Sequence, residues 1–254
     1  MKNEDHGRYG FWLSSCNVAA AEIAALIGYR SVVLDIEHGS FDLEGLDRFI
    51  PLLKGLGHEV IAKVLAAERG PIQEALDFGA DAVVIPHILG AKHAKQICGF
   101  AKFPPLGDRS FAGGRTVAFG AADDAWVKEQ DRKTKCYPMV EDAGAIEEIE
   151  GILALDCVDG VYVGPSDLSL RRGRGAYKRS DKDFADLKHV ADAAAAAGKR
   201  WLLPAWSVEE KKFALANNAY HLTLTMEHGA LAAGLREAWT LTEKLSSEMA
   251  AVAR

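Results

Sequence analysis

The stretch SVVLDIEHG, residues 31–39, decides the fold of this chain. It begins with branched apolar residues and ends in Asp35, Glu37, His38 and Gly39. A short run that is apolar at every position is typical of a strand buried on both faces, as in a parallel sheet. Functional groups in such sheets gather at the carboxyl ends of the strands. We therefore expect a site at this tip, although ion pairs with a nearby arginine or lysine would also account for the two carboxylates.

Strand-like and helix-like segments alternate along the rest of the chain. Strands are predicted at residues 11–15, 31–37, 59–64, 81–87, 135–141, 160–164, 200–206 and 221–226. Helices are predicted at residues 17–28, 43–57, 70–79, 90–103, 144–155, 183–198, 207–218 and about 229–252. Eight strand–helix units in 254 residues predict an α/β fold, a (β/α)8 TIM barrel that forms a single domain over residues 1–254.

Individual residues refine the limits of these helices. Asn17 is placed to cap the start of the first helix, and Gly28 is placed to end it. Ser207 and Glu210 have the spacing of a capping box. Pro51 falls inside the second predicted helix and predicts a kink or a break there.

Composition excludes several classes of function. The net charge is −6 and no basic stripe is available to neutralise phosphates, so a nucleic-acid partner is not expected. No segment reaches the ~18 consecutive apolar residues that span a bilayer, so no membrane partner is expected. No GxGxxG follows the first strand and no GxxxxGK(S/T) occurs, which leaves nucleotide-binding folds without their phosphate loop. The cysteines show no metal or disulfide spacing and favour a reducing, cytoplasmic location; they are Cys16, Cys98, Cys136 and Cys157.

Ionisable residues follow most of the predicted strands, and a barrel would bring them to one rim. Glu141 and Asp167, after neighbouring strands, form a natural pair of hard oxygen ligands for a divalent cation, with water and substrate completing the coordination. Either carboxylate could instead cap the helix or turn that follows it, and the spacing alone leaves both interpretations open. The other rim residues are Asp35, Glu37, His38, Lys63, His87, Asp142, Glu227 and His228.

Four segments together resemble the HpcH/HpaI aldolase family. They are IEHG, EALDFGADAVVIPHI, FPPLGDRSFAGGR and MVEDAGAIEEIEGILALDCVDGVYVGPSDLS. The resemblance runs from about Phe11 to the last predicted strand, and VDGVYVGPSDLS is its most specific motif. Members of this family are class II, metal-dependent pyruvate aldolases, such as 4-hydroxy-2-oxoheptanedioate aldolase. The resemblance implies a carbon–carbon lyase that converts a 4-hydroxy-2-oxo acid to pyruvate, or a related 2-oxo acid, and an aldehyde.

The resemblance also implies roles for individual residues. His38 matches the catalytic histidine, and Asp77 matches an aspartate that raises the basicity of this histidine across a subunit interface. Glu141 and Asp167 match the carboxylates that hold Mg²⁺, Mn²⁺ or Co²⁺. The turn Gly164, Pro165 and Ser166 matches the segment whose amides receive the substrate carboxylate. The family forms homohexamers, built as trimers of dimers that exchange the last helix, here about 229–252.

Two positions depart from the family pattern. Lys63 replaces an arginine that orients pyruvate, which keeps the charge but loses the bidentate fork. Met139 replaces a glutamine that could hydrogen-bond the substrate. These changes imply an altered substrate or a reduced activity. Lys63 at a strand end would also suit a Schiff-base enzyme, but the two metal carboxylates would then have no role. If Lys63 does not touch the enolate, Arg115 is the first alternative cation.

Two loops are expected to shape the aldehyde end of the site. They are the long loop from Pro104 to about Asp123 and the loop that contains residues 171–174. Their arginines agree with an acidic aldehyde, and equally with simple surface solvation; they are Arg109, Arg115, Arg171 and Arg172. Two other functions remain open: a citrate-forming or CoA-thioester lyase that uses the same metal enolate, and a barrel that binds a 2-oxo acid without turnover.

Overall fold

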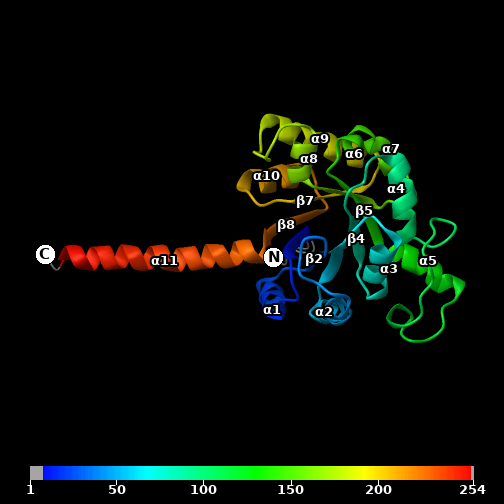
Figure 1. The fold of residues 1–254 in the computed structure, drawn as a ribbon, viewed down its shortest axis with the longest axis horizontal. Helices are drawn as coiled ribbons and strands as arrows, with labels where there is room; N and C mark the ends of the chain where they lie inside the picture. The colour runs from blue at the N-terminus through cyan, green and yellow to red at the C-terminus, as the bar shows by residue number, and fades with distance from the viewer. Residues whose placement is uncertain (1–7, 253–254) are drawn as a thin grey trace.

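A computed structural model describes residues 8–252 and shows a closed barrel of eight parallel strands (Figure 1). Each strand pairs with its neighbours in sequence, and β8 closes the barrel against β1. The (β/α)8 fold predicted from the sequence is confirmed. The strands are β1 Tyr9–Leu13, β2 Ser31–Asp35, β3 Glu59–Lys63, β4 Ala82–Ile85, β5 Lys135–Val140, β6 Gly160–Val163, β7 Arg200–Pro204 and β8 His221–Met226.

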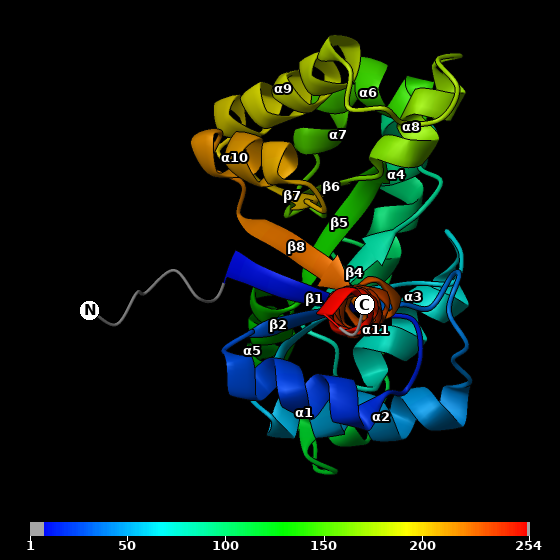
Figure 2. The same cartoon turned by 90° about the vertical axis from the view of Figure 1, so that its left-hand side faces the viewer.

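Helices follow the strands and cover the outside of the barrel (Figure 2). Asn17, Gly28 and the capping box of Ser207 with Glu210 act as predicted. The α-helices are α1 Val18–Ile27, α2 Leu43–Gly55, α3 Arg69–Asp77, α4 Ala91–Cys98, α5 Asp124–Lys133, α6 Ala143–Glu147, α7 Ile149–Leu153, α8 Pro165–Arg171, α9 Asp181–Ala196, α10 Val208–Ala216 and α11 Glu227–Val252. The 3-10 helices are η2 Gly99–Ala101 and η3 Arg115–Val117.

Three helical segments differ from the prediction. The predicted helix 144–155 is divided into α6 and α7 at Glu148, whose side chain accepts the Ala91 N–H at 2.7 Å at the start of α4. Helix α5 buries none of its residues, so no apolar stripe reveals it in the sequence. Helix α8 is a short helix within an expected loop, and it begins at Pro165, which has a backbone suited to a first helical position.

Helix α2 continues through Pro51, so the predicted break is wrong. A proline has no N–H, and the carbonyl four residues earlier therefore loses its helical partner. That carbonyl belongs to Asp47, and Arg115 Nη2 donates to it at 3.4 Å. The same guanidinium lies 3.0 Å from the Asp47 carboxylate. The arginine thus partly replaces the hydrogen bond that proline removes.

The two-residue period of the strands decides which side chains enter the barrel. Buried apolar residues fill its interior; they are Trp12, Val33, Ile61, Ala82, Val84, Tyr137, Met139, Tyr162 and Leu202. Two residues further along β2, β3 and β5, the same inward alternation reaches Asp35, Lys63 and Glu141. The strand register places Asp35 directly beside Lys63. A polar layer therefore caps an apolar interior at the carboxyl end of the barrel.

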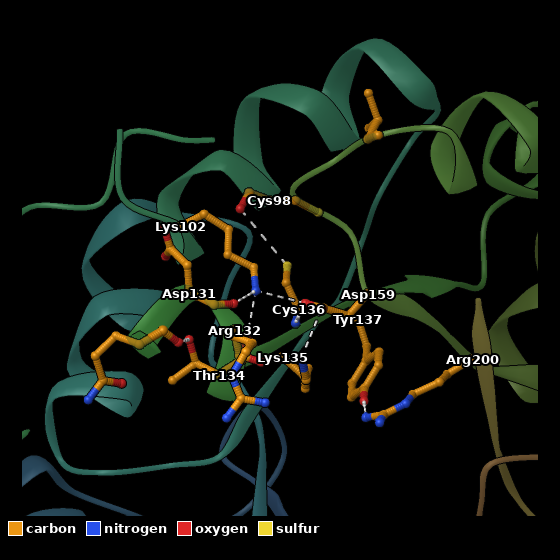
Figure 3. A network of polar contacts seen from close by, with 12 residues as sticks. Cys98, Lys102, Asp131, Arg132, Thr134, Lys135, Cys136, Tyr137, Asp159 and Arg200 are labelled. Carbon is orange, nitrogen blue, oxygen red and sulfur yellow. Dashed lines mark hydrogen bonds and ion pairs between the residues drawn. The ribbon is translucent and has the colours of Figure 1, made fainter. Parts of the chain in front are cut away.

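The opposite end of the barrel carries the long loop and α5. Lys102 Nζ donates to the carbonyls of Asp131 and Thr134 at 2.8 and 2.6 Å, and lies 2.9 Å from Asp159 Oδ2 (Figure 3). Asp159 immediately precedes β6, so this network anchors α5 at the amino ends of the strands. Loop 104–123 therefore does not line the site at the carboxyl end of its own barrel, and the expectation that it shapes this site is wrong within one chain.

His221 is a buried histidine at the start of β8. Its Nε2 lies 2.6 Å from Ser31 Oγ, and its Nδ1 has no hydrogen-bond partner among the described residues. Gly10 provides the space, because a Cβ at that position would lie 2.3 Å from His221 Nε2. Burial lowers the pKa of His221 to about 3. The folded protein therefore holds this imidazole neutral.

We expect the free energy of unfolding to fall with acidification because of His221. The unfolded histidine takes up a proton near pH 6.5, whereas the folded one does so near pH 3. The stability is complete above pH 6.5 and is lost as the pH falls toward 3, by about 1.4 kcal/mol per unit. Urea unfolding at pH 7 and pH 5 should show a loss of about 2 kcal/mol from this residue. His221→Gln should flatten that dependence, and an unchanged slope would contradict the assignment.

Helix α11 extends away from the barrel as a rod of 26 residues (Figures 1 and 2). Beyond its first turn it contacts no other part of the described chain closely enough to bury a side chain. One side of the helix presents a stripe of exposed apolar residues; they are Leu231, Leu235, Leu245 and Met249. Among residues 8–252, no helix has the length and apolarity that crossing a membrane requires.

Candidate active site

Lys63 lies at the centre of the polar layer. Only 3% of the residue is exposed, and its Nζ lies 3.0 Å from Asp35 Oδ1 and also contacts Glu37 Oε2. The other Asp35 oxygen accepts from Trp12 Nε1 at 3.2 Å. A buried cation that is paired with two carboxylates is held in one position, because either partner left alone would be costly. Lys63 is therefore a fixed positive charge at the end of β3.

Glu37 connects Lys63 to two histidines. Its carboxylate lies 2.7 Å from His87 Nε2 and 3.5 Å from His38 Nε2. Burial raises the pKa of Glu37, but the hydrogen bond and charge of Lys63, with the histidines, lower it by more, so the net shift is downward. Gly39 allows the chain to turn at this tip, because a Cβ there would lie 2.3 Å from the Asp35 carbonyl. Glu37 is thus an ionised acceptor beside His38.

Glu141 follows β5 and points into the same region. Only 4% of it is exposed, and its Oε1 accepts the backbone N–H of His87 at 2.7 Å. Burial raises the pKa of Glu141; contacts with His87 and the charge of Lys63 oppose this rise, whereas the negative charge of Asp167 adds to it. The negative charge of Asp167 thus acts on Glu141 from within the same cavity.

The turn after β6 places backbone amides next to Glu141. Helix α8 begins at Pro165, and the amides of Ser166 and Asp167 lie in its first turn, where N–H groups have no partner within the helix. Glycine fits position 164 closely, because a Cβ there would lie 2.8 Å from Glu141 Cβ. The missing side chain allows β5 and β6 to approach at this point.

These groups line one cavity of about 510 Å³ at the carboxyl end of the barrel. The side chain of His38 is 67% exposed and reaches this cavity from β2. The lining residues are Trp12, Asp35, His38, Lys63, Met139, Glu141, Gly164, Pro165, Ser166, Asp167, Leu170, Ala176, Tyr177, Arg179, Pro204 and Trp206. The cavity therefore contains a histidine, a buried lysine and three carboxylates, of which Asp35 is paired with that lysine.

The sequence profile of the HpcH/HpaI aldolase/citrate lyase family matches residues 8–225. The chain belongs to this family. A crystal structure of an HpcH/HpaI aldolase from Desulfitobacterium hafniense superimposes with a TM-score of 0.85 at 26% identity, over 93% of each chain. The resemblance found in the sequence is thus confirmed at the level of the family and its barrel.

Curated relatives of this HpcH/HpaI chain include aldolases with different substrates. The 2-keto-3-deoxy-L-rhamnonate aldolase of Klebsiella pneumoniae is 30% identical over 65% of this chain and 62% of its own length. The hydroxypyruvate/pyruvate aldolase of Roseobacter denitrificans is 30% identical over 77% of this chain and 78% of its own. The chain thus spans less than two thirds of the length of the first of these relatives.

Two predicted site residues lie away from the cavity of this HpcH/HpaI barrel. Asp77 ends α3, which leads back toward the amino ends of the strands, and it accepts from Arg109 Nη2 at 2.7 Å. Its role across a subunit interface stays a prediction. Arg115 binds Asp47 on α2 and does not line the cavity. Arg115 is therefore not the alternative cation within one chain, because loop 104–123 folds at the other end of the barrel.

The structure brings together residues that the sequence analysis did not select. Trp12 is an inward-facing residue of β1. Trp206 lies just after β7 at the carboxyl end of the barrel, and this position after a strand could have identified Trp206 from the sequence. Tyr177 and Arg179 come from the segment between α8 and α9, and no strand pattern predicts their position. His87 was expected at the rim and lies between Glu37 and Glu141.

Proposed function

We propose that this chain is a metal-dependent aldolase that cleaves a 4-hydroxy-2-oxo acid to pyruvate, or a related 2-oxo acid, and an aldehyde. The observation that carries the proposal is the shared cavity of Glu141, Asp167, Lys63 and His38. Two carboxylates can hold a cation, a fixed ammonium can stabilise an oxyanion, and a histidine can move a proton. The names of the relatives agree with this reaction class.

The donor set fits a divalent cation. Glu141 and Asp167 line the same cavity, and a bound cation would offset both the burial of Glu141 and the negative charge of Asp167, which raise its pKa. No cluster of three or more histidine, cysteine, aspartate or glutamate ligands occurs among residues 8–252. The protein thus offers two hard oxygen donors and leaves the other positions to water and substrate, as for Mg²⁺, Mn²⁺ or Co²⁺. When bound, the ion polarises the keto oxygen of the substrate.

Residues of the chain stabilise the enolate, transfer the proton and bind the substrate carboxylate. An ammonium has three donors, and Lys63 directs two at Asp35 and Glu37, which leaves one for the enolate oxygen. As the C3–C4 bond breaks, its electron pair becomes the enolate, and His38 accepts the proton of the C4 hydroxyl directly or through water. The amides of Ser166 and Asp167 suit the substrate carboxylate. Met139 offers the substrate an apolar contact in place of a hydrogen bond.

Removal of the metal tests this proposal. We expect excess EDTA to abolish cleavage of a 4-hydroxy-2-oxo acid, and Mg²⁺, Mn²⁺ or Co²⁺ to restore it. Exchange of the C3 protons of pyruvate with deuterium should show the same dependence, which a barrel that only binds a 2-oxo acid would lack. Full activity in EDTA, together with inactivation by borohydride and pyruvate, would replace the metal mechanism with an imine at Lys63.

A homohexamer is the second part of the proposal, and it rests on the family resemblance and on α11. Beyond its first turns this helix buries no side chain against its own chain, and Leu231 at its start lines a groove with Phe11, Ile23, Ile27 and Tyr29. A helix exchanged between subunits would cover both surfaces. In such an assembly, we expect Asp77 of one chain to lie near His38 of a neighbouring chain.

We expect light scattering to give about six times the chain mass of 27.4 kDa at micromolar concentration. Leu235→Asp should dissociate the assembly, because it places a charge in the apolar stripe of α11. Ala233→Asp adds the same charge about 200° around the helix from Leu231 and is the matched control. A particle of 27.4 kDa for the unmodified chain would refute the hexamer and the role of Asp77 across an interface.

A further inference from the structure

Several of the residues that line the cavity are aromatic or apolar. Trp12 and Trp206 meet edge to face, with ring centroids 6.0 Å apart and planes at 81°. Tyr177, Leu170 and Pro204 line the same cavity. Trp206 is 36% exposed, so part of its indole remains free to contact a ligand. Such a wall gains most from covering a flat apolar group.

The cations near this wall are already paired. Arg179 lines the cavity, but its Nε lies 3.1 Å from Glu210 Oε2, and Glu210 is fully buried. The Arg179 guanidinium also stacks over the Tyr177 ring at 5.2 Å. Arg179 is thus anchored to Glu210 through Nε, and Glu210 also accepts the backbone N–H of Ser207 at 2.7 Å.

The neighbouring arginines are engaged in the same way. Arg174 lies 2.6 Å from Asp186 and 3.1 Å from Asp183, and Arg172 lies 3.4 Å from Asp186. Arg171 faces Asp142 at 3.8 Å. None of these arginines lines the cavity. Among the loop arginines, only Arg179 therefore lines the cavity, with its Nε beside Glu210.

We propose that the aldehyde partner of this enzyme is aromatic, and that Trp206 is the residue that selects it. The inference rests on the proposed aldolase function, because it concerns the carbon that bonds to C3 of the pyruvate enolate. The carbonyl carbon of the aldehyde lies beside Lys63 and His38, and its ring lies along Trp12 and Trp206. Arg179 and Glu210 hold the segment that carries Tyr177 over the ring.

A comparison of three aldehydes tests the assignment. The metal-loaded full chain is given pyruvate with benzaldehyde, glyceraldehyde or succinic semialdehyde, and kcat/KM is measured for each aldehyde. We expect benzaldehyde to exceed both of the others by about tenfold, the gain from one good aromatic contact. A preference for succinic semialdehyde would show a free cation at the wall and overturn the proposal. A preference for glyceraldehyde would overturn it in favour of a polyhydroxylated partner.

Substitution of Trp206 separates selection from folding. We expect Trp206→Ala to raise KM for benzaldehyde by about tenfold, a far larger effect than on the rate of C3 proton exchange of pyruvate. Trp206→Phe keeps an aromatic face and should restore most of the affinity. Equal losses with every aldehyde and in proton exchange would reduce Trp206 to a structural role. Normal exchange with the wrong aldehyde order overturns only this inference, whereas absence of exchange in the wild-type chain overturns the proposed function and this inference with it.

Discussion

Glu141→Gln is expected to abolish metal-dependent turnover and to leave the barrel folded. Glutamine keeps an oxygen for the N–H of His87, so the end of β5 retains its contact. It removes one of two anionic donors, and a neutral amide is a poor substitute for a carboxylate with a hard cation. Without metal, the variant should be as stable as the wild type or more so, because burial already raises the pKa of Glu141 and disfavours its charge.

Thermal unfolding with and without Mn²⁺ measures both the loss of metal binding and the stability of the metal-free variant. At 100 times the dissociation constant, Mn²⁺ should stabilise the wild type by about 2.7 kcal/mol and Glu141→Gln hardly at all. Asp142→Asn is the matched control, because it removes one negative charge at the next residue and keeps a good N-cap for α6. Equal metal stabilisation of Glu141→Gln and the wild type would show that Glu141 only anchors His87.

Much of this site could be predicted, because the barrel follows from a regular pattern. Asp35, Lys63 and Glu141 each stand at the end of a buried run, and a parallel barrel brings the ends of all strands to one rim. The order of strands in the barrel is the order in the sequence. Nothing beyond strand limits was therefore needed to bring together residues that are about a hundred positions apart.

The pairing of the cations could not be predicted from the sequence. The double contact of Lys63 depends on the register of β2 against β3, which local patterns do not fix. The arginines between α8 and α9 looked available for a substrate, yet Asp183, Asp186 and Glu210 neutralise them. The tertiary fold of the segment between α8 and α9 decides these ion pairs. The same fold places Tyr177 at the cavity, so the sequence alone did not identify this residue.

Lys63 is expected to stabilise the enolate oxygen. We expect Lys63→Ala to lower kcat by about 10²–10³ with little change in KM for pyruvate, because an enolate oxygen carries more charge than a ketone oxygen. The substitution also leaves Asp35 and Glu37 buried without their cation, at a cost of about 3–5 kcal/mol in folding stability. Turnover must therefore be compared below the unfolding temperature of the variant.

Lys63→Arg separates the two effects of the alanine substitution, because arginine keeps the charge between Asp35 and Glu37 and restores the family residue. We expect it to retain stability and to match or exceed the wild type in cleaving simple 4-hydroxy-2-oxo acids. The decisive measurement is C3 proton exchange of pyruvate. If Lys63→Ala exchanges as fast as the wild type, the ammonium does not touch the enolate. Arg179, the other cation that lines the cavity, would then have to leave Glu210 and take that place.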